Sequence, residues 1–235
     1  MVVKEAPPTP PALLELKLSI LNCTTCGEFT ERKVKKTGEI KRTPLVKIRA
    51  GQTRLTDSSS SPVPSFGSIS PKYLFIGEAP GENEDEEGEP FIGRSGRYLK
   101  KVLLKLAGIQ LSDCRFTNVV KCHPLRNRDP YASEIKACMP WLEAEIDLLQ
   151  PEVIFTLGRI STQALLGKNK STQLKNTHGQ LFEWNGYPVM PLYHPASVNR
   201  AVPEKVMKND FKTILSKIES NLESETSEDG ETSFI

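Results

Sequence analysis

Four short apolar runs, three of them followed by helix-like stretches, constrain the fold of this chain more than any other feature. The runs cover residues 72–76, 115–120, 153–157 and 188–193. Apolar residues at helical spacing follow the first three runs, at 95–107, from residue 129 onward and at 159–166. Alternating strands and helices are typical of a parallel sheet with helices on both faces. We therefore predict a three-layer α/β/α sandwich with a central, mainly parallel, four-stranded sheet.

Local signals predict where these helices begin and end. Gly108 is expected to end the first helix, and the pair Asp129-Pro130 to begin the second. Pro140 then predicts either a kink in the second helix or the start of another one.

Length and composition predict one domain with irregular ends. The chain has 235 residues, 37% of them hydrophobic, which suffices for a proper core. We expect a disordered N-terminus over 1–11, a single domain over 12–217 and an acidic disordered tail over 218–235. Residues 51–71 are rich in serine and proline, and we expect a flexible insertion at about 30–70. A short helix is expected just before Cys23.

The bulk properties exclude few classes of function. No run of 18 or more apolar residues and no charged-then-apolar leader occurs, so we expect a soluble, cytoplasmic protein with no membrane partner. The net charge of +2 is too small to identify a nucleic-acid binder.

The segment directly after the first strand, residues 77–96, carries the strongest functional signal. It holds five glycines, two prolines, a cluster of acids and one phenylalanine, Phe91. It lies at the carboxyl end of a strand, where open α/β sheets bind ligands. Glycines allow close backbone approach, so such a loop can hold a flat ring against an aromatic face. A solvated acidic loop is the alternative interpretation.

Two later segments, 117–122 and 194–200, combine with this loop into a recognisable set. They read Thr-Asn-Val-Val-Lys-Cys and His-Pro-Ala-Ser-Val-Asn-Arg. With the cysteine spacing, the set resembles the uracil-DNA glycosylases of family four, the branch with an iron–sulfur cluster, over about residues 20–215. The resemblance implies a monofunctional, monomeric DNA glycosylase acting on uracil-containing DNA. It would flip uracil out, hydrolyse the N-glycosidic bond and leave an abasic site. In a prokaryote it would be associated with the nucleoid.

The five cysteines suggest metal or redox chemistry. Cys23 and Cys26 form a close pair, and Cys122 and Cys138 follow far downstream. On spacing alone, zinc, an iron–sulfur cluster and unreactive thiols all stay open. The resemblance implies that these four cysteines ligate a [4Fe–4S] cluster. It gives the fifth cysteine, Cys114, no role as a ligand.

The resemblance also implies roles for individual residues. Phe91 would stack on uracil, Asn118 would bind its O4 and N3–H, and His194 would stabilise the departing O2. Glu78 is the first choice for activating water. The other expected substrate-binding residues are Gly77, Ala79 and Glu84. The expected DNA contacts are Arg200, which would fill the gap left by the flipped base, and Pro195, which would fix that loop. Lys121, a basic residue beside Asn118, is a candidate for phosphate contact, with ordinary surface charge as the alternative.

Two other functions compete with the enzyme. Ala79 stands where the best-known glycosylase branch has an aspartate, and the insertion is large. A non-catalytic DNA-binding or polymerase-associated module with the same fold and cluster is therefore the main alternative. A zinc-binding nucleic-acid module would explain the cysteines but not the pocket loop.

Overall fold

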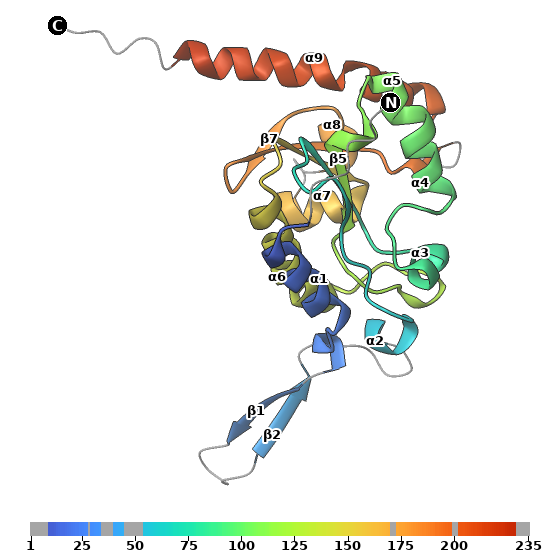
Figure 1. Cartoon of the computed structure of the whole chain (residues 1–235), viewed down its shortest axis with the longest axis vertical. Helices are drawn as coiled ribbons and strands as arrows, with labels where there is room; N and C mark the ends of the chain where they lie inside the picture. The colour runs from blue at the N-terminus through green and yellow to red at the C-terminus, as the bar shows by residue number, and fades with distance from the viewer. Residues whose placement is uncertain are drawn as a thin grey trace, which may run out of the picture.

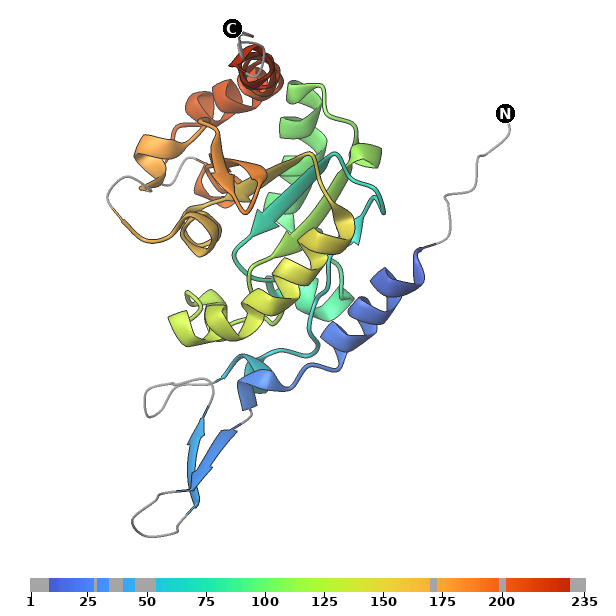
Figure 2. The same cartoon turned by 90° about the vertical axis from the view of Figure 1, so that its left-hand side faces the viewer.

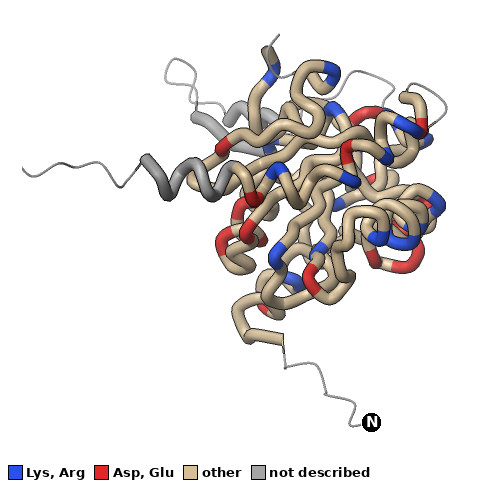
Figure 3. The backbone as a smooth tube through the Cα atoms, turned by 90° about the horizontal axis from the view of Figure 1, so that it is seen from above, with Lys and Arg blue, Asp and Glu red and all other residues tan. Residues whose placement is uncertain are grey.

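The computed structural model describes most of the chain at the level of individual residues. The described ranges are 9–27, 29–33, 40–44, 54–169, 173–198 and 202–228. Within these ranges, no helix combines the length and the apolar character needed to cross a membrane. Basic and acidic positions are interspersed over the described backbone (Figure 3).

A mixed sheet of six strands forms the centre of the molecule (Figure 1), in the order β3-β5-β4-β6-β8-β7. Its strands are β3 (Phe66–Gly67), β4 (Tyr73–Gly77), β5 (Cys114–Asn118), β6 (Val153–Leu157), β7 (Phe182–Trp184) and β8 (Tyr187–Leu192). The four central strands are parallel and are the four predicted ones. The predicted count of four is too low, because β3 and β7 add antiparallel edges. Strands of two and three residues are too short to show an alternating pattern.

Helices cover both faces of this sheet, as the sequence predicts (Figures 1 and 2). One face is covered by α1 (Pro11–Leu21), α6 (Ala132–Leu149) and α7 (Arg159–Leu166). The other face is covered by α4 (Arg94–Tyr98), the π-helical segment Leu99–Leu103, α5 (Leu104–Ala107) and α9 (Glu204–Glu228). Neighbouring residues of β4 point to opposite layers. Phe75 packs in the core beneath α5 and α9, whereas Leu74 and Ile76 pack beneath α1 and α6. The three-layer α/β/α sandwich is confirmed.

Two helices differ in detail from the sequence prediction. The stretch predicted as one helix over 95–107 is α4, a π-helical turn and α5 in succession, and it ends at Gly108 with φ 74°. The helix expected to begin at Asp129-Pro130 begins at Ala132, behind a capping interaction at Tyr131. It continues through Pro140 to Leu149, so no second helix starts there.

The expected insertion is partly built into the domain. Strands β1 (Phe29–Lys33) and β2 (Ile40–Pro44) pair as an antiparallel hairpin that projects from the body near α2 (Leu55–Ser58) (Figures 1 and 2). From residue 54 onward the chain packs, since Leu55 and Val63 are fully buried. The expected flexibility therefore does not extend to residues 54–70.

The ends of the expected domain also shift. Helix α9 continues to Glu228, so it includes the first eleven residues, 218–228, of the expected acidic tail. The predicted disordered stretches fall partly outside the described residues, at 1–8 and 229–235. The remaining helices are α3 (Glu82–Glu87) and α8 (Leu174–Thr177).

Candidate active site

A cavity of about 630 Å³ lies at the carboxyl ends of the central strands. Loops after β4, β5, β6 and β8 all contribute to its wall. Among its lining residues are six that the sequence analysis assigned to the site: Glu78, Ala79, Glu84, Phe91, Asn118 and His194. Segments up to 116 residues apart (194 − 78) therefore converge at the edge of the sheet where α/β proteins bind ligands.

Phe91 and Asn118 line the cavity, and Gly77 lies directly against both side chains. A Cβ atom at Gly77 would lie 2.7 Å from Cζ of Phe91 and would also overlap the side-chain oxygen of Asn118. Only glycine allows the ring and the amide to lie this close to the strand end. Phe91 itself has φ 59°, a left-handed conformation that side chains other than those of asparagine and aspartate rarely adopt. The loop thus holds a buried aromatic ring beside an amide that can both donate and accept.

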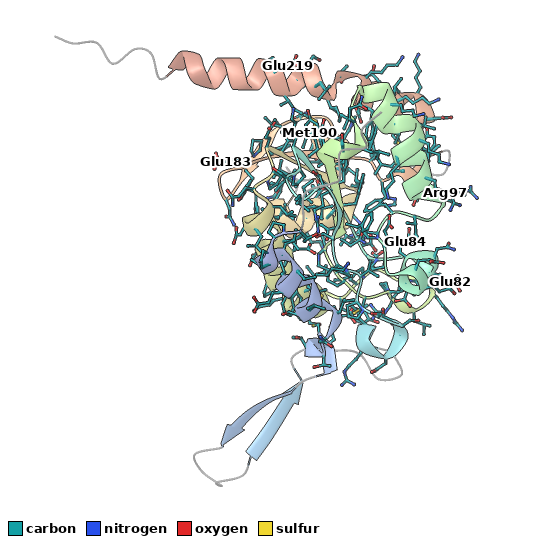
Figure 4. All side chains as sticks on the ribbon, in the orientation of Figure 1. Glu82, Glu84, Arg97, Glu183, Met190 and Glu219 are labelled. Atoms are coloured by element: carbon teal, nitrogen blue, oxygen red, sulfur yellow. The ribbon has the colours of Figure 1, made fainter. Side chains whose placement is uncertain are left out.

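Glu84 fixes the loop that carries Phe91. Its Oε1 atom accepts a hydrogen bond from the backbone N–H of Gly93 at 2.8 Å. The side chain is 9% exposed, and it lies on the inner side of α3, whereas Glu82 lies on the outer side (Figure 4). A carboxylate tied to the backbone in this way shapes the wall of the cavity and stays in place.

His194 follows β8 and enters the cavity as a neutral ring. Its Nδ1 atom accepts a hydrogen bond from the backbone N–H of Ala196 at 3.1 Å. The proton of the neutral ring is therefore on Nε2. Burial lowers the pKa of His194 to about 4, and the charge of Glu84 offsets part of this shift. At neutral pH the ring therefore presents an uncharged N–H donor.

Glu78 also lines the cavity, and its carboxyl group has an unusually high pKa. Burial is the main cause that raises the pKa of Glu78 to about 7, and the charge of Asp129 adds to it. The charge of Arg159 acts in the opposite direction. A carboxyl group that is partly ionised at neutral pH is suited to accept a proton there.

The sequence analysis missed Arg159 and Asp129. Arg159 lines the cavity at the start of α7, and its Nη2 atom lies 2.5 Å from Oδ2 of Asp129. Gly158, between β6 and α7, was the available signal, because it marks a strand end at the ligand-binding edge. The ion pair itself joins residues 30 positions apart (159 − 129), which no local pattern indicates.

Comparison with known proteins agrees with this arrangement. The profile of the Uracil DNA glycosylase superfamily matches residues 64–219, which include every described residue of the cavity. The chain belongs to the uracil-DNA glycosylase superfamily. This confirms the resemblance inferred from the three segments and the cysteine spacing.

Several members of the uracil-DNA glycosylase superfamily are similar to this chain over most of their length. A type-4 uracil-DNA glycosylase of Saccharolobus solfataricus is 41% identical over 67% of this chain and 76% of its own. Those of Sulfurisphaera tokodaii and Archaeoglobus fulgidus are 38% and 35% identical, over 71% and 65% of this chain and 79% of each relative.

The four cysteines expected to bind the cluster interact with one another in pairs. A hydrogen bond joins Cys26 and Cys138 and is the main cause of both of their pKa shifts. It raises the pKa of Cys26, and it lowers the pKa of Cys138 to about 7. Cys122 interacts electrostatically with Cys138 and with Cys23, and it accepts a hydrogen bond from Ser59. Among the described residues, no three His, Cys, Asp or Glu side chains converge as ligands of a single metal ion would. A four-iron cluster is larger than one ion and is held by four thiolates.

Further donors point at the sulfur atoms. Trp141 donates its indole N–H to Sγ of Cys23 at 3.2 Å, and the backbone N–H of Lys121 donates to Cys138. Hydrogen bonds to sulfur are among the interactions by which proteins stabilise iron–sulfur clusters. The thiols and their donors fit such a group.

The prediction that Lys121 contacts DNA phosphate is wrong. Lys121 is 1% exposed, and its Nζ atom is bonded to Glu145 at 2.6 Å, to Thr117 at 2.7 Å and to the carbonyl of Asn118 at 2.9 Å. A lysine enclosed in this way cannot reach a phosphate. It holds the end of β5 in place instead.

Three other expectations have different outcomes. Pro195 is buried at the start of a short 3-10 turn, Pro195–Ser197, directly after His194. Arg200 lies outside the described residues, so its predicted role stays a prediction. The alternative of a solvated acidic loop does not hold for Asp85, which is 6% exposed and accepts hydrogen bonds from Ser59 and Ser60.

Proposed function

We propose that this protein is a uracil-DNA glycosylase that flips uracil out of DNA and hydrolyses its N-glycosidic bond. One observation carries the proposal: Phe91, Asn118 and His194 line a single cavity at the strand ends. Together they supply an aromatic surface, a paired donor and acceptor, and a neutral N–H donor. These groups match the three steps of the reaction: the aromatic surface stacks on the extruded pyrimidine, the donor and acceptor identify it, and the N–H donor assists its release.

Each group has a defined task in this reaction. Phe91 stacks on the base, and the amide of Asn118 binds O4 and N3–H of uracil, a pattern that cytosine reverses. As the bond to the sugar breaks, negative charge grows on O2 of the base. The Nε2–H of His194 donates a hydrogen bond to that oxygen while the ring stays neutral. Glu78 takes a proton from the attacking water.

The decisive experiment uses a duplex oligonucleotide with one uracil. Release of free uracil and an alkali-labile site in the strand would support the enzyme. Tight binding without product would instead favour the non-catalytic DNA-binding module, which keeps the same cavity.

The pH dependence of the reaction follows from Glu78. Below pH 7 its carboxyl group is increasingly protonated and cannot accept a proton, so kcat/KM should fall with an acid limb centred near pH 7. His194 stays neutral down to about pH 4 and adds no limb in this range. Removing the negative charge in Asp129→Asn should move the limb to lower pH, and Arg159→Gln should move it to higher pH.

Glu78→Gln is the control for this assignment. It should lower the rate and remove the limb. A limb that persists near pH 7 in Glu78→Gln would assign the titration to another group.

We further propose that Cys23, Cys26, Cys122 and Cys138 hold a [4Fe–4S] cluster. When bound, the cluster would join the N-terminal segment to the loop after β5 and to α6, and hydrolysis needs no electron from it. Protein purified without oxygen should show visible iron–sulfur absorption, and Cys138→Ser should lose both colour and thermal stability. Cys114→Ser is the matched control, because this buried thiol bonds to the carbonyl of Gln110 instead. A colourless wild-type protein that binds zinc would contradict the proposal.

A further inference from the structure

An exposed leucine stands at the mouth of the cavity, on a turn that the proposed mechanism does not use. Leu125 is 47% exposed, and its neighbours Pro124, Asn127 and Arg128 line the cavity. The turn is a short 3-10 segment, Leu125–Asn127, closed by the N–H of Asn127 bonding to the carbonyl of Pro124 at 2.9 Å. An apolar side chain is thus presented to solvent beside the opening.

The backbone of this turn is held in an unfavourable conformation. Arg126 and Asn127 have φ values of 56° and 53°, two consecutive left-handed residues without a glycine. Such conformations cost free energy and are concentrated at functional sites. The conformation keeps Leu125 and Arg126 outside the fold, where both are exposed.

The turn is anchored firmly on both sides. On one side Pro124 is buried. On the other, Arg128 donates to both carboxylate oxygens of Glu134 at 2.7 and 2.8 Å and lies over the ring of Tyr131 at 3.9 Å. Glu134 is fully buried. The exposed tip therefore stands on a rigid base, as a side chain that pushes into a stack of bases must.

We propose that Leu125 is a wedge that enters the base stack beside the flipped nucleotide, on the side of the opening formed by the loop after β5. Proteins that kink or open duplex DNA insert apolar side chains, leucine among them, between base steps. The exposed cation of Arg126 next to it suits the flanking phosphates. The inference rests on the proposed function, since it concerns how a duplex substrate is opened.

The wedge predicts a defect confined to stacked substrates. Leu125→Ala should lower kcat/KM for uracil in a duplex about tenfold, because a partly buried leucine contact is lost. It should leave the rate on the same uracil in single-stranded DNA within about twofold, because no stack has to be opened there. Leu111→Ala is the matched control. Leu111 is 52% exposed but precedes β5, at the opposite edge of the sheet.

A second measurement detects the wedge without turnover. A 2-aminopurine beside a non-cleavable 2′-fluorinated deoxyuridine should brighten on binding wild-type protein and Leu111→Ala, and much less with Leu125→Ala. Equal rates of Leu125→Ala and wild type on duplex, or an equal loss on both substrates, would overturn the wedge. Failure of the proposed function looks different, because wild-type protein would then release no uracil from either substrate.

Discussion

His194→Ala should reduce the turnover of uracil-containing DNA by a factor of about 10² to 10³, or about 2.7–4 kcal/mol of transition-state stabilisation. The imidazole is fixed by the bond from the N–H of Ala196 to Nδ1, so Nε2–H is already aimed when charge develops on the leaving base. Alanine leaves that charge without its donor. Single-turnover uracil release at saturating enzyme measures the loss at the chemical step.

His194→Gln serves as the matched variant. Its amide can supply an N–H donor, so it should recover part of the rate that alanine loses. The melting temperature should stay near the wild-type value in both variants, because His194 lines the cavity and belongs to neither core cluster. Wild-type turnover in His194→Ala would show that the imidazole has no part in the reaction.

Lys121→Met should lower the free energy of unfolding by about 3–5 kcal/mol, the effect of removing one partner from a buried ion pair. The carboxylate of Glu145 would stay buried, with the hydrogen bonds from Ser65 and Thr117 but without the ammonium group of Lys121. The guanidinium of Arg115, which interacts with it electrostatically, would be its remaining countercharge. For a chain of this size the loss corresponds to a fall in melting temperature of roughly 10 °C. Thermal unfolding followed by circular dichroism measures it.

Two variants separate the ion pair from other effects. Lys136→Met removes an exposed lysine from α6 and should change stability by less than about 0.5 kcal/mol. The double variant Lys121→Met/Glu145→Gln removes both charges but keeps an acceptor for Ser65, and should recover much of the loss. Unchanged stability in Lys121→Met, together with a weaker salt dependence of DNA binding, would restore the role in phosphate contact.

Asn118 and Lys121 show which parts of the site the sequence could predict and which it could not. Asn118 ends β5 and Lys121 follows it by three residues, and the sequence analysis assigned both to substrate or DNA. Asn118 lines the cavity, whereas the chain turns after β5 and buries Lys121 against α6. The difference depends on Glu145, 24 residues further on (145 − 121), which forms no motif with Lys121.

The segment 54–70 also shows that tertiary contacts can override a prediction from local sequence. Its serines and prolines predict a flexible linker, yet Ser59 and Ser60 bond to Asp85 on α3 and Leu55 is buried beside the cysteines. Composition reports how a segment behaves in isolation. Whether it packs depends on partners elsewhere in the chain.

The amino-acid order alone determined the four central strands, their parallel arrangement and the family, because buried strands and glycine-rich ligand loops leave local patterns. Tertiary structure alone decided that Lys121 is enclosed, that Arg159 pairs with Asp129, and that Leu125 is presented at the opening. Burial and ion pairing depend on distances between residues far apart in the chain, and such distances exist only after the layers have packed.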